Sequence, residues 1–184
     1  MPIKTENPPV VCIVGRSGSG KTTVIEKLVP ELRRHGLRVG TIKHHIGEFE
    51  LDLPGKDSWR HKQAGSVNAM ISSPQRIGMV MDVDHDSTPE DLAPFFKGVD
   101  IILGEGYKRG NNPKVEIFRP EIHKKPFCTD DNLLIALICD VSIDLGVPRF
   151  TTSDTRGLVR YLIDRFKIPR REGSAKGNGN SPVH

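Results

Sequence analysis

Short apolar runs recur along the chain and alternate with amphipathic segments, which is the pattern of a sheet covered by helices. The runs at 10–14 and 99–104 are continuous and typical of strands buried on both faces. Further strands are predicted over 37–43, 115–118 and 133–139, with period-2 alternation in the second of these. We therefore expect these five segments to form the central sheet.

The first helix is predicted from the spacing of its apolar residues. Its apolar positions follow i, i+3, i+4, i+7 spacing, and they are Ile25, Leu28, Val29 and Leu32. Gly36 stands where the C-terminal cap of that helix is expected.

Two more helices complete the pattern. The segment 87–91 carries a hydroxyl cap, a proline in the first turn and two acidic residues, which predicts a helix running to about residue 97. Apolar residues at 158, 162 and 166 predict the last helix. Strands that alternate with helices indicate the α/β class: a mostly parallel sheet of the P-loop NTPase type, with helices on both faces in three layers.

The segment between the second strand and the helix at 87–97 differs from the rest. Residues 44–56 form a long loop, which in a compact domain is usually functional or mobile. A short helix capped by Asp57 or Ser58 ends at Gly65. The short link between the strands at 67–72 and 76–83 favours a hairpin.

The domain organisation follows from length and composition. A chain of 184 residues fits one domain, predicted over 9–168 between a flexible N-terminus at 1–8 and a disordered Gly/Ser/Asn-rich tail at 169–184. The apolar runs are strand-sized and the N-terminus lacks the apolar core of a secretory signal, so we expect no membrane span and a cytoplasmic location.

The distribution of charge argues against a nucleic acid partner, and the spacing of the cysteines argues against a metal site. Half of the net charge of +4 lies in residues 170–184, so the folded part lacks the basic stripe of a nucleic-acid-binding protein, and we expect no nucleic acid partner. Cys12, Cys128 and Cys139 are scattered and include no C-x-x-C pair, so structural roles are favoured over a metal site.

The first motif that indicates a chemical function follows the first predicted strand. The stretch Gly15-Arg16-Ser17-Gly18-Ser19-Gly20-Lys21-Thr22 matches each fixed position of the phosphate-binding loop G-x-x-x-x-G-K-[ST], between a strand and a helix. Its glycines let successive backbone N–H groups turn around a β-phosphate. Lys21 can then reach the β- and γ-phosphates, and the Thr22 hydroxyl can bind Mg²⁺.

Acidic residues near strand ends are the next candidates, because ligands of such sheets lie at the carboxyl ends of the strands. Glu105 follows the strand at 99–104 and is favoured as a Mg²⁺ ligand over a solvated loop acid. Asp57 either orients the attacking water or binds magnesium through water, or it is a plain helix cap. Asp140 follows the last central strand and can accept hydrogen bonds from a guanine base.

Basic residues lie near the same position. Lys108 and Arg109 follow Glu105 closely enough to contact phosphates or a second anionic ligand, and a solvated basic turn is an equal alternative. No arginine or glutamine can be assigned as a catalytic group that speeds hydrolysis, so we expect hydrolysis to be weak. Arg60 and Arg109 are the nearest guesses for such a group.

Several separated motifs together resemble one family. They are the phosphate loop, Thr41-Ile42-Lys43-His44, Pro54-Gly55-Lys56-Asp57-Ser58-Trp59, Ala64-Gly65 and Glu105-Gly106-Tyr107-Lys108. Over about residues 9–167 the chain resembles the family of molybdopterin-guanine dinucleotide biosynthesis protein B. The resemblance implies a homodimeric GTP-binding protein with weak GTPase activity. Such a protein assists a separate guanylyltransferase in attaching GMP to molybdopterin.

The expected site combines the motif with the strand-end acids. The residues expected to carry chemistry are Lys21, Asp57 and Glu105, with Thr22 and Glu105 as the Mg²⁺ ligands. The residues expected to bind GTP are Gly15, Arg16, Ser17, Gly18, Ser19, Gly20, Lys21, Thr22, Thr23 and Asp140. Two other functions stay open: a small-molecule kinase, which would usually carry an arginine-rich lid, and a metal-delivering GTPase, which would need a Cys/His cluster.

Overall fold

A computed structural model describes residues 7–169. They divide into two compact units, a larger one made of the described residues up to 44 and from 88 onward, and a smaller one at 45–87. The ends predicted to be flexible, 1–8 and 169–184, lie outside the described residues except for 7, 8 and 169. Over the described range, no helix has the length and hydropathy needed to cross a bilayer.

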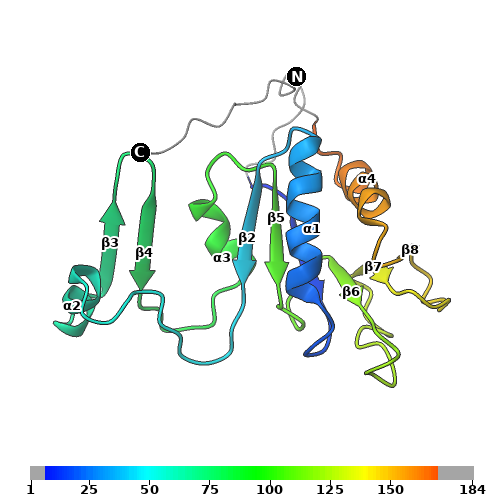
Figure 1. The fold of residues 1–184 in the computed structure, drawn as a ribbon, viewed down its shortest axis with the longest axis horizontal. Helices are drawn as coiled ribbons and strands as arrows, with labels where there is room; N and C mark the ends of the chain where they lie inside the picture. The colour runs from blue at the N-terminus through cyan, green and yellow to red at the C-terminus, as the bar shows by residue number, and fades with distance from the viewer. Residues whose placement is uncertain (1–6, 170–184) are drawn as a thin grey trace, which may run out of the picture. The chain divides into compact units, whose positions relative to one another are not determined.

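A six-stranded parallel sheet forms the centre of the larger unit, in the order β2-β5-β1-β6-β7-β8 (Figure 1). The strands are β1 (Val10–Val14), β2 (Val39–Lys43), β5 (Ile101–Glu105), β6 (Lys114–Ile117), β7 (Leu134–Ile138) and β8 (Arg149–Phe150). The prediction of a mostly parallel α/β sheet is confirmed. The strand β8 was not predicted, because two residues carry too short a pattern to be read.

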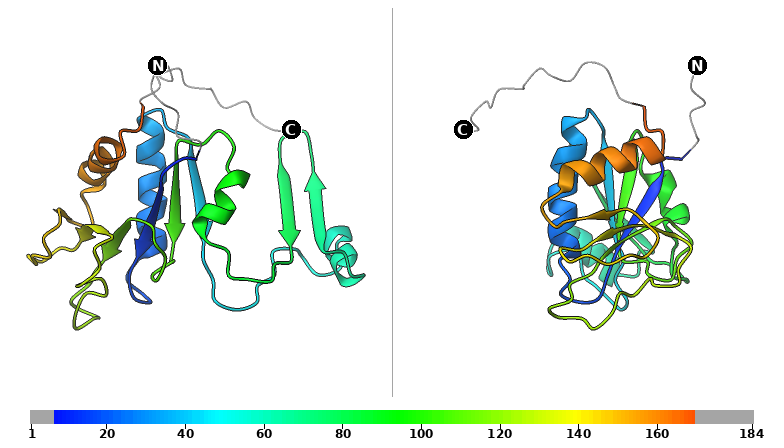
Figure 2. Two further views of the ribbon diagram at one scale, coloured as in Figure 1. Left: turned by 180° about the vertical axis from the view of Figure 1, so that it is seen from behind. Right: turned by 90° about the vertical axis from the view of Figure 1, so that its right-hand side faces the viewer.

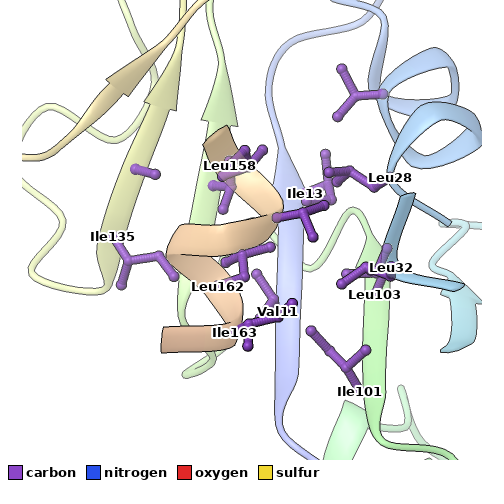
Figure 3. Packing of buried hydrophobic residues seen from close by; sticks show 14 of the residues in the cluster. Val11, Ile13, Leu28, Leu32, Ile101, Leu103, Ile135, Leu158, Leu162 and Ile163 are labelled. Carbon is purple, nitrogen blue, oxygen red and sulfur yellow. The ribbon is translucent and has the colours of Figure 1, made fainter. Parts of the chain in front are cut away.

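Helices cover both faces of this sheet. Helices α1 (Lys21–Arg34) and α4 (Thr155–Arg165) pack on one face, where Leu28, Leu103 and Leu162 are buried together (Figure 3). On the other face lie the short helix α3 (Pro89–Leu92) and the 3-10 helix η1 (Ala93–Phe95), over a second buried cluster that includes Cys12 and Ile102. The edge-on view of Figure 2 shows the resulting three layers.

Two helix ends in the larger unit follow the predicted signals, and a third does not. Gly36 closes α1, its N–H donating to the carbonyl of Arg33 at 2.9 Å. Thr88 caps α3 in a capping box with Asp91, as the sequence indicates. The helix expected to reach residue 97 ends at Leu92 and continues only as the 3-10 turn, because Pro94 has no N–H to donate to the preceding turn.

The smaller unit, His45–Ser87, holds a helix and a hairpin. Helix α2 (Asp57–Gln63) is followed by strands β3 (Asn68–Ser72) and β4 (Ile77–Met81), which pair antiparallel as predicted. Lys56 occupies the N-cap position of α2, so the expectation that Asp57 or Ser58 caps this helix is wrong. Residues 45–56 contain neither helix nor strand, in agreement with the predicted loop.

Large apolar side chains remain exposed over much of the smaller unit. In the loop they are Ile46, Phe49, Leu51 and Leu53, and in and beside the hairpin they are Val67, Met70, Ile71, Ile77 and Val83, each more than half exposed. Ala69 is the apolar residue that the hairpin buries, and Ser58 is buried in α2. This unit therefore lacks an apolar core comparable to that of the larger unit.

Candidate functional site

The phosphate loop connects the central strand β1 to helix α1 at the carboxyl edge of the sheet (Figure 1). Gly15 leaves β1 with a φ of 149°, and a Cβ there would lie 2.6 Å from both the Ile117 carbonyl oxygen and Ser19 Oγ. Only glycine allows the loop to pass this close to β6. Gly20 stands at the N-cap of α1, so the loop leads directly into the positive end of a helix.

Lys21 is the first residue of α1, and its ammonium group lies across the loop. Its Nζ donates to the carbonyl oxygens of Gly15 at 3.3 Å and of Arg16 at 3.0 Å. Burial and the charge of nearby Lys108 lower the pKa of Lys21, against the opposite effect of Glu105. An anion bound beside the Lys21 ammonium group would offset both its burial and the charge of Lys108.

Thr22 and Glu105 meet although they are 83 positions apart in the chain. Strand β5 is the parallel neighbour of β1, with Ile13 opposite Glu105, so the carboxylate stands beside the start of α1. Thr22 Oγ1 lies 3.0 Å from one carboxylate oxygen of Glu105 and 2.9 Å from the other. A hydroxyl and a carboxylate beside a phosphate loop are the protein ligands that Mg²⁺ takes when substrate phosphates and water supply the rest.

The chain turns sharply after Glu105. Gly106 has a φ of 102° and Tyr107 a φ of 52°, so two consecutive residues adopt left-handed backbone conformations. A Cβ on Gly106 would come within 3.1 Å of His44 Cβ, which requires glycine there. The Tyr107 ring is 8% exposed and stacks on the His44 ring, with 4.4 Å between the centroids. Sequence reasoning did not find this anchor, because a left-handed tyrosine has no local signature.

A second loop, residues 119–128 after β6, lies against the phosphate loop. The ring nitrogen Nε2 of His123 is 3.2 Å from the carbonyl oxygen of Ser17. The far end of this loop is held by Glu116 of β6, which is buried and accepts hydrogen bonds from the N–H groups of Phe127 at 2.6 Å and Cys128 at 2.8 Å. The sequence gives no sign of this, since Glu116 resembles any polar residue of an alternating strand.

Asp140 follows β7 at the carboxyl edge of the same sheet, and it is exposed. Its Oδ1 accepts a hydrogen bond from the backbone N–H of Thr152 at 2.8 Å, and its Oδ2 accepts one from the Thr152 hydroxyl at 2.8 Å. These bonds hold the pKa of Asp140 below its usual range, so the carboxylate is a fixed acceptor near neutral pH.

The remaining predicted residues fall into three groups. Arg16, Ser17, Gly18 and Thr23 are exposed on the loop and the first turn of α1, whereas Ser19 is buried and its Oγ has no hydrogen-bond partner. Lys108 is half-buried and Arg109 is exposed, both following Tyr107. Asp57 and Arg60 belong to the smaller unit, where their side chains are 90% and 69% exposed and 3.7 Å apart.

Three of the predicted residues are therefore brought together, namely Lys21, Thr22 and Glu105. Asp100 is excluded from this group, because it stands at the opposite end of β5 and its carboxylate accepts a hydrogen bond from the Arg38 N–H at 2.7 Å. All three cysteines are free and buried. Burial raises the pKa values of Cys12 and Cys128 to about 12, which keeps both thiols protonated.

Comparison with known proteins gives consistent matches. The family model described as molybdopterin guanine dinucleotide synthesis protein B matches residues 10–140. A Haemophilus influenzae protein named molybdopterin-guanine dinucleotide biosynthesis adapter protein is 35% identical over 164 residues, which cover 88% of this chain and 84% of that protein. The Escherichia coli protein of the same name is 31% identical, with coverage of 85% and 92%. The crystal structure of Bacillus subtilis MobB aligns with a TM-score of 0.68 at 27% identity, over 85% of this chain and 97% of that one.

Proposed function

This chain belongs to the molybdopterin guanine dinucleotide synthesis protein B family, and we propose that it is a GTP-binding adapter in molybdopterin guanine dinucleotide biosynthesis. The observation that carries the nucleotide part is the contact of Thr22 Oγ1 with both carboxylate oxygens of Glu105, at 2.9 and 3.0 Å, beside a complete phosphate loop. The adapter part rests on the names of the relatives.

The loop residues Gly15 to Thr22 would hold the phosphates of the nucleotide through backbone N–H groups and the ammonium of Lys21. Thr22 and Glu105 would hold Mg²⁺, which when bound neutralises charge between the β- and γ-phosphates. The Thr22 hydroxyl can keep its hydrogen bond to Glu105 and offer a lone pair to the ion. In this arrangement Glu105 orients the hydroxyl as well as supplying negative charge.

Asp140 is the proposed acceptor for the guanine base. Its carboxylate is ionised and held in one orientation by Thr152, which suits a group that must accept hydrogen bonds from two guanine N–H donors. A fixed acceptor of this kind would disfavour adenine, which has no donor at the corresponding ring nitrogen.

Slow hydrolysis is part of the proposal. We infer that Asp57 orients the attacking water, and its carboxylate is exposed at the start of α2. Hydrolysis would be weak, because no arginine or glutamine of the described residues is assigned to speed it.

The proposed partners are molybdopterin, a guanylyltransferase and a second copy of the chain. The apolar side chains exposed on the smaller unit support a homodimer, because a two-stranded hairpin with an apolar surface is marginally stable alone. The proposed cytoplasmic location agrees with the pathway.

Calorimetric titration with GTP and ATP, each with Mg²⁺ and with EDTA, tests the nucleotide assignment. We expect GTP to bind more tightly than ATP, and Mg²⁺ to strengthen GTP binding. Equal affinity for ATP and GTP would contradict the assignment of the base. A guanylyltransferase assay with and without this chain tests the adapter role, with faster product formation expected when the chain and GTP are both present.

A further inference from the structure

Lys108 is the second lysine near the phosphate loop, and the structure holds it on two sides. The left-handed turn at Gly106 and Tyr107 directs the chain away from β5 immediately after the proposed Mg²⁺ ligand Glu105. The Tyr107 ring, buried against His44, fixes the backbone from which Lys108 projects. Lys108 is consequently half-buried, whereas the next residue, Arg109, is exposed.

The ammonium group of Lys108 lies over an aromatic ring of the 119–128 loop. Its Nζ is 5.5 Å from the centroid of the Phe127 ring, within the range of a cation–π interaction. Phe127 is itself held by its N–H bond to buried Glu116, 2.6 Å long. The same loop contacts the phosphate loop through His123, so Lys108 lies between two segments that are both tied to the site.

The contacts around Lys108 place it beside the phosphate loop. Glu105, three positions before it, is bonded to the Thr22 hydroxyl at the end of that loop. Lys21 Nζ lies across the same loop, where it donates to the Arg16 carbonyl oxygen at 3.0 Å. A multiply charged anion bound in the loop would attract the ammonium groups of both lysines.

We propose that Lys108 is a second phosphate-binding lysine of the nucleotide site and contacts the γ-phosphate of the bound nucleoside triphosphate. The phosphate loop and Lys21 follow β1, whereas Glu105 and Lys108 follow its parallel neighbour β5, so the two lysines would approach a bound triphosphate from different strands. This inference rests on the proposed nucleotide function. Phe127 is a positioning residue, because it acts through Lys108.

The experiment compares Lys108→Ala with Lys97→Ala, which removes the same charge from an exposed position that precedes β5. Calorimetry with GTP and with GDP, both with Mg²⁺, measures the two affinities for each variant. Lys108→Ala should weaken GTP binding by about 10-fold or more, the effect of losing one charge-assisted hydrogen bond, and should change GDP binding by less than about twofold. Lys97→Ala should change both affinities by less than about twofold.

A third variant, Phe127→Leu, tests the positioning contact. It keeps an apolar side chain of similar burial and removes the ring, so GTP binding should weaken about two- to fivefold with GDP binding unchanged. Circular dichroism of each variant shows that it is folded, and Lys108→Gln replaces Lys108→Ala if the latter is not.

Three results would overturn the inference: an unchanged GTP affinity in Lys108→Ala, an equal loss of GTP and GDP affinity, or an equal effect of Lys97→Ala. In each of these cases wild-type binding of GTP leaves the proposed nucleotide function standing. Failure of the wild-type protein to bind GTP would instead reject both, so the two failures are distinguishable.

Discussion

The two compact units of this chain place their apolar residues in opposite ways. In the larger unit the strands β1, β5, β6 and β7 are almost completely buried, and the polar groups of the site stand at their carboxyl ends. In the smaller unit the hairpin exposes most of its apolar side chains. The larger unit can therefore hold the side chains of the site in fixed positions, whereas the two-stranded hairpin of the smaller unit depends on further contacts for its stability.

The largest effect expected is on stability, from the same substitution made in each unit. Ile101→Ala, at a residue that is 0% exposed, should lower the free energy of unfolding by about 2–5 kcal/mol, whereas Ile77→Ala, at 70% exposure, should cost less than about 1 kcal/mol. Urea unfolding at low protein concentration measures both. A cost of Ile77→Ala that appears only at higher protein concentration would support the proposed homodimer through the hairpin, whereas a large cost that is independent of concentration would break the contrast.

The next effect is on ligand binding without loss of stability. Lys21→Ala should weaken GTP binding by about 30–100-fold, because its ammonium serves the phosphates, and should change the unfolding free energy by less than about 0.5 kcal/mol. Calorimetry measures the GTP affinity, and urea unfolding measures the free energy of unfolding. Arg76→Ala removes a cation from the smaller unit and should leave GTP affinity unchanged. Unchanged GTP binding in Lys21→Ala would reject the site.

A smaller effect should separate the metal from the nucleotide. Glu105→Gln keeps a hydrogen-bond acceptor for Thr22 but removes the charge, so Mg²⁺-dependent hydrolysis should fall about 10-fold while GTP binding in EDTA changes by less than about twofold. Release of phosphate at varied Mg²⁺ concentration measures this. Glu26→Gln, on the exposed surface of α1, is the matched control. Equal loss of binding and hydrolysis would identify Glu105 as a structural acid.

The smallest effect is a pH dependence of stability at Asp140. Its pKa is lowered in the folded protein by the Thr152 N–H and hydroxyl, so the ionised carboxylate stabilises the fold above the unfolded pKa of 3.8. Wild type should exceed Asp140→Asn in stability near pH 6 by less than about 1 kcal/mol, since the group is exposed and screened. This difference should disappear as the pH falls below 3.8 through the folded pKa. A difference that persists at pH 2 would contradict the role of the charge.

The sequence predicts those parts of the site that have local or positional signals. The phosphate loop is a contiguous pattern, and Glu105 was found because the carboxyl ends of parallel strands share one edge of the sheet. The hairpin and the hydroxyl cap at the start of α3 were also predicted from local signals, since turn and cap residues act on their own neighbours.

The parts that were not predicted depend on contacts between distant residues. The stacking of His44 on Tyr107 arises only when β2 and β5 are adjacent, and the Glu116 bonds form only when the 119–128 loop folds back on β6. The end of α3 is different, because it depends on the nearby residue Pro94, which the prediction of a helix to about residue 97 did not take into account. The roles proposed for Lys21, Thr22, Asp57, Glu105 and Asp140 stay predictions.

The backbone conformation at Tyr107 and the space around its side chain favour different amino acids. Its φ of 52° is a conformation in which a side chain with a Cβ costs about 1–2 kcal/mol and which glycine adopts freely. Its ring, however, occupies the buried space beside His44, which glycine would leave empty. In a library of all twenty amino acids at this position, we expect aromatic residues to be retained despite the backbone. We therefore expect the turn that carries Lys108 to tolerate few substitutions.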